Sequence, residues 1–304
     1  MRVISLHDDR GRKLVWPDPP RRVVSLVPSD TYSLIRLGGR QCLVGRTRYC
    51  IAPMPEVASI EDIGGTKDAD VDRIVALEPD AVIANQEENS RRDIERLEAA
   101  GLRVLVSFPR RVAEGVGHLA RLGRLLGLDA KAQGPGRALV AEGYQIHREA
   151  ESRRSEQPPI RAFVPIWMDP LMTVNGETFI SDMLDLVGAQ NIFEDRPRRY
   201  PLAADLGERP PLPPERVGDR DTRYPRVTLD EVVARAPEIV LLPDEPHAFG
   251  AADAEVFRGL PIPAAERGQV VHCDGKDLMW YGARALEGIE RLRALVDAAR
   301  REAR

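Results

Sequence analysis

The sequence predicts an α/β protein made of two similar lobes, each with a parallel sheet, bridged by a long helix. Three observations predict it. Residues 230–247 repeat residues 72–89 without a gap, each copy passes from a short helix through a proline into an apolar run, and a helical stretch separates the copies. Because helix and strand patterns alternate on both sides of that stretch, each side is typical of a parallel sheet.

The repeat defines one helix–strand unit. Asp72 and Asp230 stand at the start of the helix, and Pro79 and Pro237 end it because proline cannot continue a helix. The apolar runs that follow are typical of strands in a sheet covered on both faces. Loops after such strands bind ligands, so we expect an acidic loop of each copy to face a cleft between the lobes. The alternative is chance similarity between two generic helix–strand units.

The composition indicates a globular protein large enough for two domains. The chain has 304 residues, 43% of them hydrophobic, and a formal net charge of -4. Its many arginines are matched by acids, so nothing in the charge favours a nucleic-acid or membrane partner. The three cysteines do not make a disulfide framework.

The amino-terminal residues are informative about the cellular location of the protein. Residues 1–16 have the alternating pattern of a β-hairpin and lack the apolar core of a secretory signal. No stretch approaches the roughly 18 apolar residues that span a bilayer. The sequence as it stands therefore predicts a cytoplasmic protein, and a periplasmic or membrane-associated one where a leader has been removed.

The predicted amino-terminal lobe covers residues 1–127. Pro28, Ser29 and Asp30 open its first helix, and Gly38 closes it. In order, its elements are hairpin strands 2–6 and 12–16, strand 22–27, helix 31–37, strand 42–45, loop 46–50, a glycine-bearing loop 62–70, the first repeat copy, helix 90–100 and strand 103–107.

The bridge between the lobes is predicted as a helix within residues 128–157. A helix over 112–126 precedes it, since apolar residues recur there at helical spacing. Asp129 can cap the bridging helix, which runs to about Arg153, and a Gly-Pro-Gly segment should kink its early part.

The predicted carboxy-terminal lobe covers residues 158–304. Residues 194–227 are rich in arginine, proline and aspartate, and we expect them to form a long surface insertion that is ordered only in part. Its other elements are strand 160–166, helix 179–186, the second repeat copy, strand 269–273, loop 274–282 and a closing amphipathic helix over 283–301.

Acidic residues follow the repeated strands. Glu87 and Glu88 follow the first copy's strand, and Glu245 follows the second. Converging carboxylates suit a cationic or metal-bearing ligand, or an array of sugar-like hydroxyl groups. The alternative is that the pair begins the next helix, where the helix dipole favours acids.

Aromatic residues in the predicted loops suggest stacking on a flat ligand. Trp167, Trp280 and Tyr281 lie outside strand interiors. The alternative is that they pack beneath their loops. Arg284, at the start of the closing helix, is placed to hold an anionic group such as a phosphate or carboxylate.

Soft metal ligands are few. Cys50, His247, His272 and Cys273 are candidates, but none has the paired spacing of a zinc site, so direct metal ligation stays unassigned. Cys273, at a strand end, favours the core. Cys50, in a loop beside Tyr49, is the better candidate. No nucleophile elbow, P-loop or dinucleotide-binding fingerprint is present, so no catalytic residue is predicted.

Four segments in order resemble the class III periplasmic substrate-binding proteins. They are SLVPSDT after the first core strand, the Gly-Gly loop before DVDRIVALEPDAVIA, the bridging helix, and DGKDLMWYG before the last helix. The resemblance covers roughly residues 20–300 and is greatest to the cobalamin-binding-like subgroup of helical-backbone metal receptors. It implies two Rossmann-like lobes bridged by a long helix, and service to ATP-driven importers of vitamin B12 or iron-siderophores.

The resemblance also implies site residues. The first lobe would contribute the loops that carry Ser29, Tyr49, Cys50, Gly65, Glu87 and Glu88, and the second Trp167, Glu245, Trp280 and Tyr281. Asp72 and Asp230 occupy the positions of the surface acids that dock on transporter arginines, where the family usually has glutamate. The Asn85–Asn89 loop is acidic and polar where a corrinoid binder would show an aromatic residue.

These observations predict a monomeric, non-enzymatic solute-binding protein of ABC-importer type. The expected ligand is a small-molecule metal chelate, either a corrinoid such as cobalamin or an iron-siderophore or haem-like compound, bound in the cleft without a covalent cofactor. An ABC transporter permease is the expected partner. The alternative is a cytosolic enzyme or carrier on the same scaffold that uses Cys50 on a metal or tetrapyrrole-like substrate.

Overall fold

The computed structural model describes residues 3–128, 134–154 and 157–302. The chain divides into two compact units, which are treated one at a time. Unit 1 comprises Met1–His147 with Trp280–Leu286, and unit 2 comprises Arg148–Met279 with Glu287–Arg304. The helix α5 (Pro135–Arg154) and the last helix α13 (Ala283–Glu302) each continue from one unit into the other. The predicted cap of the bridging helix at Asp129 lies outside the described residues.

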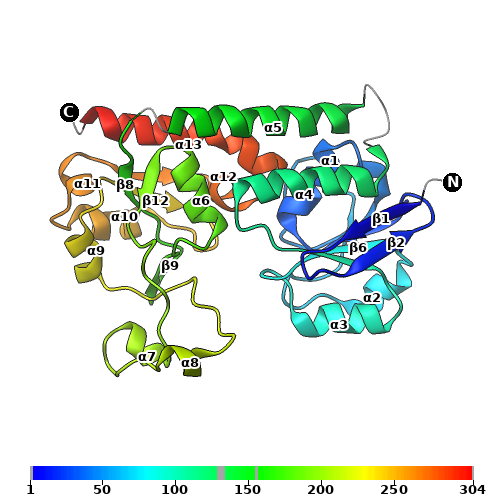
Figure 1. Cartoon of the computed structure of the whole chain (residues 1–304), viewed down its shortest axis with the longest axis horizontal. Helices are drawn as coiled ribbons and strands as arrows, with labels where there is room; N and C mark the ends of the chain where they lie inside the picture. Colours follow the sequence, from blue (N-terminus) through cyan, green and yellow to red (C-terminus); the bar gives the residue numbers. More distant parts are fainter. Residues whose placement is uncertain (1–2, 129–133, 155–156, 303–304) are drawn as a thin grey trace. The chain divides into compact units, whose positions relative to one another are not determined.

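Unit 1 contains a five-stranded parallel sheet in the order β5-β4-β3-β6-β7. A hairpin of β1 (Ile4–His7) and β2 (Lys13–Trp16) precedes it. The strands of the sheet are β3 (Val23–Ser25), β4 (Leu43–Arg46), β5 (Glu61–Asp62), β6 (Ala81–Asn85) and β7 (Val104–Ser107). The helices are α1 (Pro28–Arg36), the 3-10 turn η1 (Arg40–Cys42), α2 (Val71–Ala76), α3 (Arg91–Ala99) and α4 (Val112–Leu125). In Figure 1, α1 and α4 lie on one side of this sheet, with α2 and α3 on the other.

Unit 2 contains a four-stranded parallel sheet in the order β11-β8-β12-β13. Its strands are β8 (Ile160–Phe163), β11 (Ala189–Asn191), β12 (Ile239–Pro243) and β13 (Val270–Cys273), and β9 (Trp167–Met168) with β10 (Leu171–Met172) forms a small hairpin. The helices are α6 (Phe179–Leu186), α7 (Leu202–Asp205), α8 (Pro214–Val217), α9 (Leu229–Arg235), α10 (Ala251–Arg258), α11 (Pro263–Glu266) and α12 (Gly275–Met279). Residues 275–279, predicted as loop, are thus a short helix.

The sequence repeat is a structural repeat. All five residues of β6 and of β12 are buried, as expected for strands with covered faces. Glu78 and Ala236 occupy equivalent positions between helix and strand, with φ of 44° and 42°. They are the two non-glycine residues with positive φ in the part of the chain that the structure describes. Because left-handed backbone costs a non-glycine residue about 1 to 2 kcal/mol, both copies make the same unusual turn.

An arginine secures that turn in each unit. The Arg22 side chain donates to the carbonyl that follows α2, and its backbone N–H donates to the Asp80 carboxylate at 2.9 Å. In unit 2 the Arg161 side chain donates to the carbonyl that ends α9, and its N–H donates to Glu238 at 3.0 Å. In both lobes an arginine therefore hydrogen-bonds the end of the repeated helix and the acid that follows the proline. Both lobes also contain a parallel sheet.

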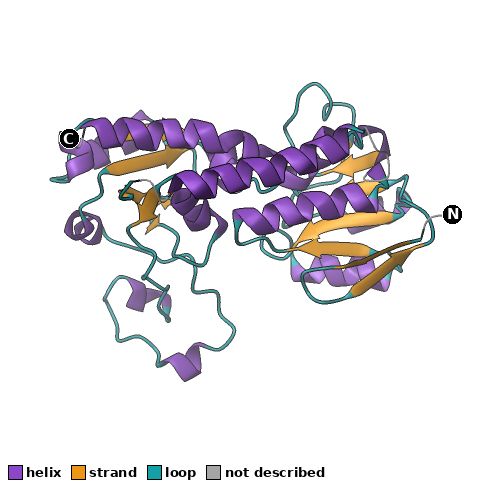
Figure 2. Cartoon of the chain, turned by 45° about the horizontal axis from the view of Figure 1, so that its top comes forward, coloured by secondary structure: helices purple, strands orange, loops and turns teal. Residues whose placement is uncertain are grey.

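The insertion at residues 194–227 carries α7 and α8 on a long loop that extends from the sheet of unit 2 (Figure 1 and Figure 2). All of it lies within the described residues, and its partial order stays a prediction. A buried ion pair holds it, since Arg196 Nη1 lies 3.2 Å from Asp205 Oδ1. The same carboxylate accepts the backbone N–H groups of Arg199 and Arg226, so one buried aspartate ties three points of the loop together.

Helix α1 begins earlier than the sequence predicts. Pro28 occupies its first turn, where proline is favoured because that N–H has no helical partner. Ser29 and Asp30 consequently lie inside the first turn of the helix, and both are buried. The predicted Ser29 loop is therefore a buried helix start.

Candidate ligand-binding site

The loop after β4 presents Tyr49 at the carboxyl end of the sheet in unit 1. Its neighbour Cys50 is fully buried and bonded to two threonines. Thr31 Oγ1 donates to its Sγ at 3.1 Å, and Thr47 Oγ1 shares a hydrogen bond with the same Sγ at 3.2 Å. Burial raises the pKa of the Cys50 thiol to about 11. With Cys50 anchored inward, Tyr49 and Ile51 on either side are more than half exposed.

Because Gly65 has no side chain, the Tyr49 ring and the Asp68 carboxylate can lie close to its backbone. A Cβ atom at this position would stand 2.0 Å from Asp68 Oδ1 and 3.4 Å from Tyr49 Cε2. A Cβ atom here would therefore displace the Asp68 side chain and stand in van der Waals contact with the tyrosine ring. The structure brings Gly65 and Tyr49, both predicted from the sequence, into one patch.

Glu87 and Glu88 lie in a tight turn at the end of β6. Asn85 Oδ1 accepts the N–H groups of Glu87 at 2.7 Å and Glu88 at 3.1 Å. Asn89 Oδ1 in turn accepts the Asn85 N–H at 2.7 Å. Since Ser90 is the N-cap of α3, both glutamates precede the helix. The alternative that they begin the helix is wrong, and both half-buried side chains stand at the edge of the sheet.

Trp280 and Tyr281 are buried in unit 1. Their exposed fractions are 6% and 4%, so neither is placed to stack on a ligand, and the alternative that they pack beneath their loop is correct. Trp280 meets Tyr32 edge-on at 6.3 Å between ring centroids. The Tyr281 hydroxyl donates to Asp30 Oδ2 at 3.1 Å, and Asn85 Nδ2 donates to that hydroxyl at 3.1 Å. Burial, reinforced by the Asp30 charge, holds the pKa of Tyr281 well above its usual value.

The Asp30 carboxylate continues into a chain of polar groups that sequence reasoning missed. Its Oδ1 lies 2.8 Å from Nε2 of His118, whose Nδ1 accepts from Arg121. Arg121 also forms a two-point ion pair with Asp9, at 2.6 and 2.9 Å. Burial alone would raise the pKa of Asp9, but Arg121 and the N–H of Phe108 outweigh it and leave the pKa below its usual value.

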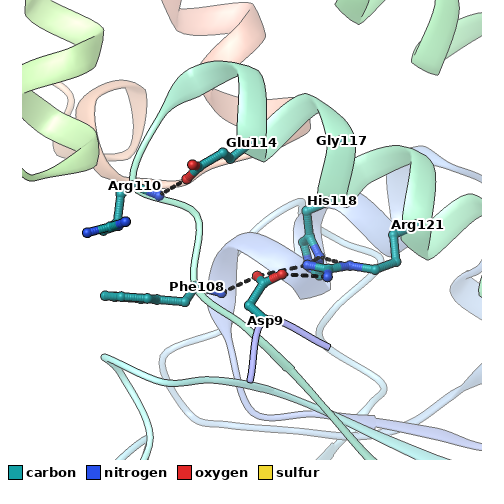
Figure 3. A pocket seen from close by; sticks show the side chains of 7 residues that line it. All are labelled: Asp9, Phe108, Arg110, Glu114, Gly117, His118 and Arg121. Carbon is teal, nitrogen blue, oxygen red and sulfur yellow. Dashed lines mark hydrogen bonds and ion pairs between the residues drawn. The ribbon is translucent and has the colours of Figure 1, made fainter. Parts of the chain in front are cut away.

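An open pocket of about 430 Å³ lies over this chain (Figure 3). It is lined by Asp9, Phe108, Arg110, Glu114, Gly117, His118 and Arg121. Asp9, His118 and Arg121 are turned toward one another, whereas the Arg110 guanidinium lies over the Phe108 ring. Arg121 is engaged by Asp9 and His118, and Glu114 accepts the backbone N–H groups at the start of α4. Most of the polar groups in the pocket therefore belong to the hydrogen-bond network of Asp30, His118, Arg121 and Asp9, which connects α1, α4 and the β1–β2 hairpin.

Trp167 is the exposed aromatic residue at the carboxyl end of the sheet in unit 2. The residue is 44% exposed, and its indole N–H donates to the Asp169 carbonyl at 2.9 Å. The ring meets His247 edge-on at 5.5 Å, and His247 meets Phe249 at 4.6 Å. Segments that follow β8 and β12 therefore meet in one aromatic cluster.

Glu245 lies beside this cluster in sequence and packs against α12. A Cβ atom on Gly275 would stand 2.6 Å from its Cγ, so this glycine permits the close approach. Lys276 lies 3.5 Å from Asp244 and 3.3 Å from Asp274. Burial would lower the pKa of Lys276, but Asp274, Glu245 and Asp244 together raise it, so a lysine partly balances this acidic edge.

The remaining predicted residues stand apart. Asp72 and Asp230 are exposed in the first turns of α2 and α9, at equivalent places in the two copies. Arg284 is half-buried in the first turn of α13. Among the described residues, no group of three or more His, Cys, Asp or Glu side chains is arranged to hold a metal ion. The cleft between lobes stays a prediction.

Two parallel sheets in one chain, each with an exposed aromatic residue at its carboxyl edge, define a two-lobed solute-binding protein. The sequence profile of the family described as periplasmic binding protein matches residues 23–276. The chain belongs to this family, which confirms the predicted family, fold class and solute-binding function. In the described residues, no helix has the length and apolar character needed to cross a membrane.

Known proteins agree with this assignment. The vitamin B12-binding protein of Photorhabdus laumondii is 25% identical over 223 residues, covering 73% of this chain and 70% of the relative. That of Yersinia pestis (strain Pestoides F) is 26% identical, covering 73% and 69%. Two solved structures share the fold. The periplasmic vitamin B12-binding protein BtuF of Vibrio cholerae has a TM-score of 0.72 at 20% identity, covering 93% of this chain and 99% of its own. The periplasmic heme-binding protein RhuT from Roseiflexus sp. RS-1 has a TM-score of 0.70 at 20% identity, covering 92% and 99%.

Proposed function

We propose that this chain binds a metal chelate with a flat ring, of the corrinoid or haem type, and delivers it to an importer. The position of the exposed aromatic residues carries the proposal. Among the described residues, the exposed large aromatic side chains are Tyr49, Tyr144 and Trp167. Tyr49 and Trp167 belong to carboxyl-end loops of the two sheets, where α/β proteins bind ligands. Tyr144 lies on α5.

The chemistry of the surrounding groups supports the same ligand class. Aromatic side chains stack on flat rings, and Ile51 and Met54 add exposed apolar surface to the Tyr49 loop. Half-buried carboxylates at both edges, Glu88 in unit 1 and Glu245 in unit 2, suit amide or hydroxyl donors on the ligand rim. Relatives named for vitamin B12 and heme have ligands of this kind.

The proposal includes a binding role without catalysis. The enzyme alternative relied on Cys50, but a buried thiol with a pKa of about 11 is protonated at neutral pH, and the thiolate is the nucleophile and metal ligand. Family membership favours the periplasmic alternative for location. We propose a permease partner that docks on the exposed acids Asp72 and Asp230, each on the first turn of a repeated helix.

Three alanine variants test the proposal. Cyanocobalamin, dicyanocobinamide and haemin are titrated by calorimetry against the wild type and against Tyr49→Ala, Trp167→Ala and Tyr144→Ala. An aromatic contact is worth about 0.5 to 1.5 kcal/mol beyond its area, so each of the first two variants should weaken Kd about tenfold. Tyr144→Ala is the matched control and should bind like the wild type. Equal Kd values for all four proteins would refute the proposed site.

A further inference from the structure

A small pocket of about 140 Å³ lies in unit 2, where the last turn of α5 meets α13. The charged residues that line it are four arginines and one aspartate, namely Arg153, Arg154, Arg293, Arg300 and Asp297. Arg293, Asp297 and Arg300 recur at helical spacing, so they share one face of α13. The pocket, called here the arginine pocket, therefore collects positive charge from two helices.

The arginine pocket lies at the edge of the sheet opposite to Trp167. Arg300 donates to the carbonyls of Pro158 and Gly188, which come just before β8 and β11. A Cβ atom on Gly188, whose φ is 88°, would stand 3.2 Å from Arg300 Nη2, so the glycine admits this guanidinium. Because Trp167 follows the carboxyl end of β8, the arginine pocket is separate from the proposed chelate site.

Arg293 is a buried cation without a carboxylate partner in the part of the chain that the structure describes. The residue is 8% exposed, and its hydrogen bonds run from Nη2 to the carbonyls of Ala150 at 3.5 Å and Leu186 at 3.1 Å. Its Nε is buried and has no hydrogen-bond partner among the described residues. Because a buried charge is costly unless it is paired, this guanidinium favours an anion in the pocket that it lines.

The two arginines of α5 are held only by exposed ion pairs. Arg153 pairs with Glu290 at 3.0 Å and Arg154 pairs with Asp185, and all four side chains are about half exposed or more. Since exposed ion pairs contribute little to stability, both guanidinium groups can turn toward an anion at small cost. The carboxylate that lines the pocket, Asp297, lies 3.6 Å from Arg300 Nε and opposes anion binding.

We infer that the arginine pocket binds a phosphate group. The fork of guanidinium donors matches the oxygens of carboxylates and phosphates. A phosphate presents oxygens in more directions than a carboxylate and carries more charge, which suits donors that come from both α5 and α13. The volume is below the roughly 300 Å³ at which pockets accept drug-sized ligands, so the pocket is too small for a corrin or haem ring. The ligand is therefore free phosphate or the phosphate of a lipid headgroup.

Calorimetric titration of inorganic phosphate into the full chain, at constant ionic strength, tests the inference. Arg293→Met should weaken Kd at least about tenfold, because a hydrogen bond between charged groups is lost. Arg154→Gln changes an exposed residue and should weaken Kd about two- to fivefold. Asp297→Asn should tighten Kd by a similar factor, a gain that a purely structural role of these arginines does not predict. Arg258→Gln, in an exposed ion pair of α10, is the matched control and should bind like the wild type.

A second arm distinguishes the two sources of the phosphate group. The same proteins are sedimented with vesicles of phosphatidylcholine, with and without phosphatidic acid. Binding of inorganic phosphate with the expected order of variants supports a site for the free anion. Binding only to the vesicles that contain phosphatidic acid, with the same order, supports a site for a lipid headgroup. Binding of neither, or affinities that Arg154→Gln and Asp297→Asn leave unchanged, overturns the inference.

Discussion

Replacement of Tyr281 by phenylalanine should destabilise unit 1 without a direct effect on ligand contacts. The hydroxyl has Asp30, Asn85 and Ser107 among its hydrogen-bond partners, so the loss can be worked out for each of these groups. Ser107 keeps its bond to the Ala84 carbonyl at 3.2 Å, and Asn85 Nδ2 stays 3.4 Å from Ser107. The bond to the buried Asp30 carboxylate is not replaced. A hydrogen bond to a charged group contributes about 1.5 to 3 kcal/mol, so the free energy of unfolding should fall by about 2 to 3 kcal/mol.

Urea unfolding followed by far-ultraviolet circular dichroism measures this change. Tyr144→Phe is the matched control, because Tyr144 is exposed on α5 and should leave the transition where it is. Chelate affinity in the absence of urea should be unchanged in both variants. A Tyr281→Phe transition that coincides with that of Tyr144→Phe would refute the account of Tyr281 as the buried donor to Asp30.

Two further variants probe the hairpin and the Tyr49 patch. The pKa of Asp9 lies below its usual value in the folded chain, so its contribution to stability is complete above the unfolded pKa near 3.9 and is lost as pH falls. Asp9→Asn should therefore unfold at a lower temperature than the wild type at pH 6, with the difference shrinking as the pH is lowered below the unfolded pKa of Asp9; a constant difference across that range would contradict the Arg121 pairing. Gly65→Ala should weaken chelate binding, because its Cβ meets Asp68 Oδ1, and Gly65→Ala with Asp68→Ala should restore it. A double variant no better than the single one would show that Asp68 is not the obstacle.

The sequence predicted the elements of the fold well because the signals for them are local. The repeat, the two prolines and the apolar runs lie in adjacent positions, and the structure has a helix–strand unit at each copy. It adds a left-handed turn at Glu78 and Ala236 that the sequence did not predict. The internal contacts of the insertion were harder to predict, since they include the buried pairing of Arg196 with Asp205. The residues adjacent to Arg196 and Asp205 in the sequence give no sign that these two side chains form a buried ion pair.

The site was predicted less well because burial is a property of distant contacts. Trp280 and Tyr281 follow a loop-like pattern, yet their partners lie near residues 30 and 107. Cys50 was predicted to be accessible to a ligand because it follows Tyr49 in a loop, but its thiol is buried and bonded to Thr31 and Thr47. Likewise, the contact of His247 with Trp167 joins loops from two strands, which no local pattern shows.

The return of Trp280–Leu286 into unit 1 has a consequence for biosynthesis. The bond between Ser107 and Tyr281 spans 174 positions of chain. At about 5 to 20 residues per second, the ribosome needs roughly 10 to 35 s to supply the second partner after the first. During that interval the Asp30 carboxylate lacks the phenol that later covers it. The amino-terminal lobe therefore gains its last buried partners only when translation is nearly finished.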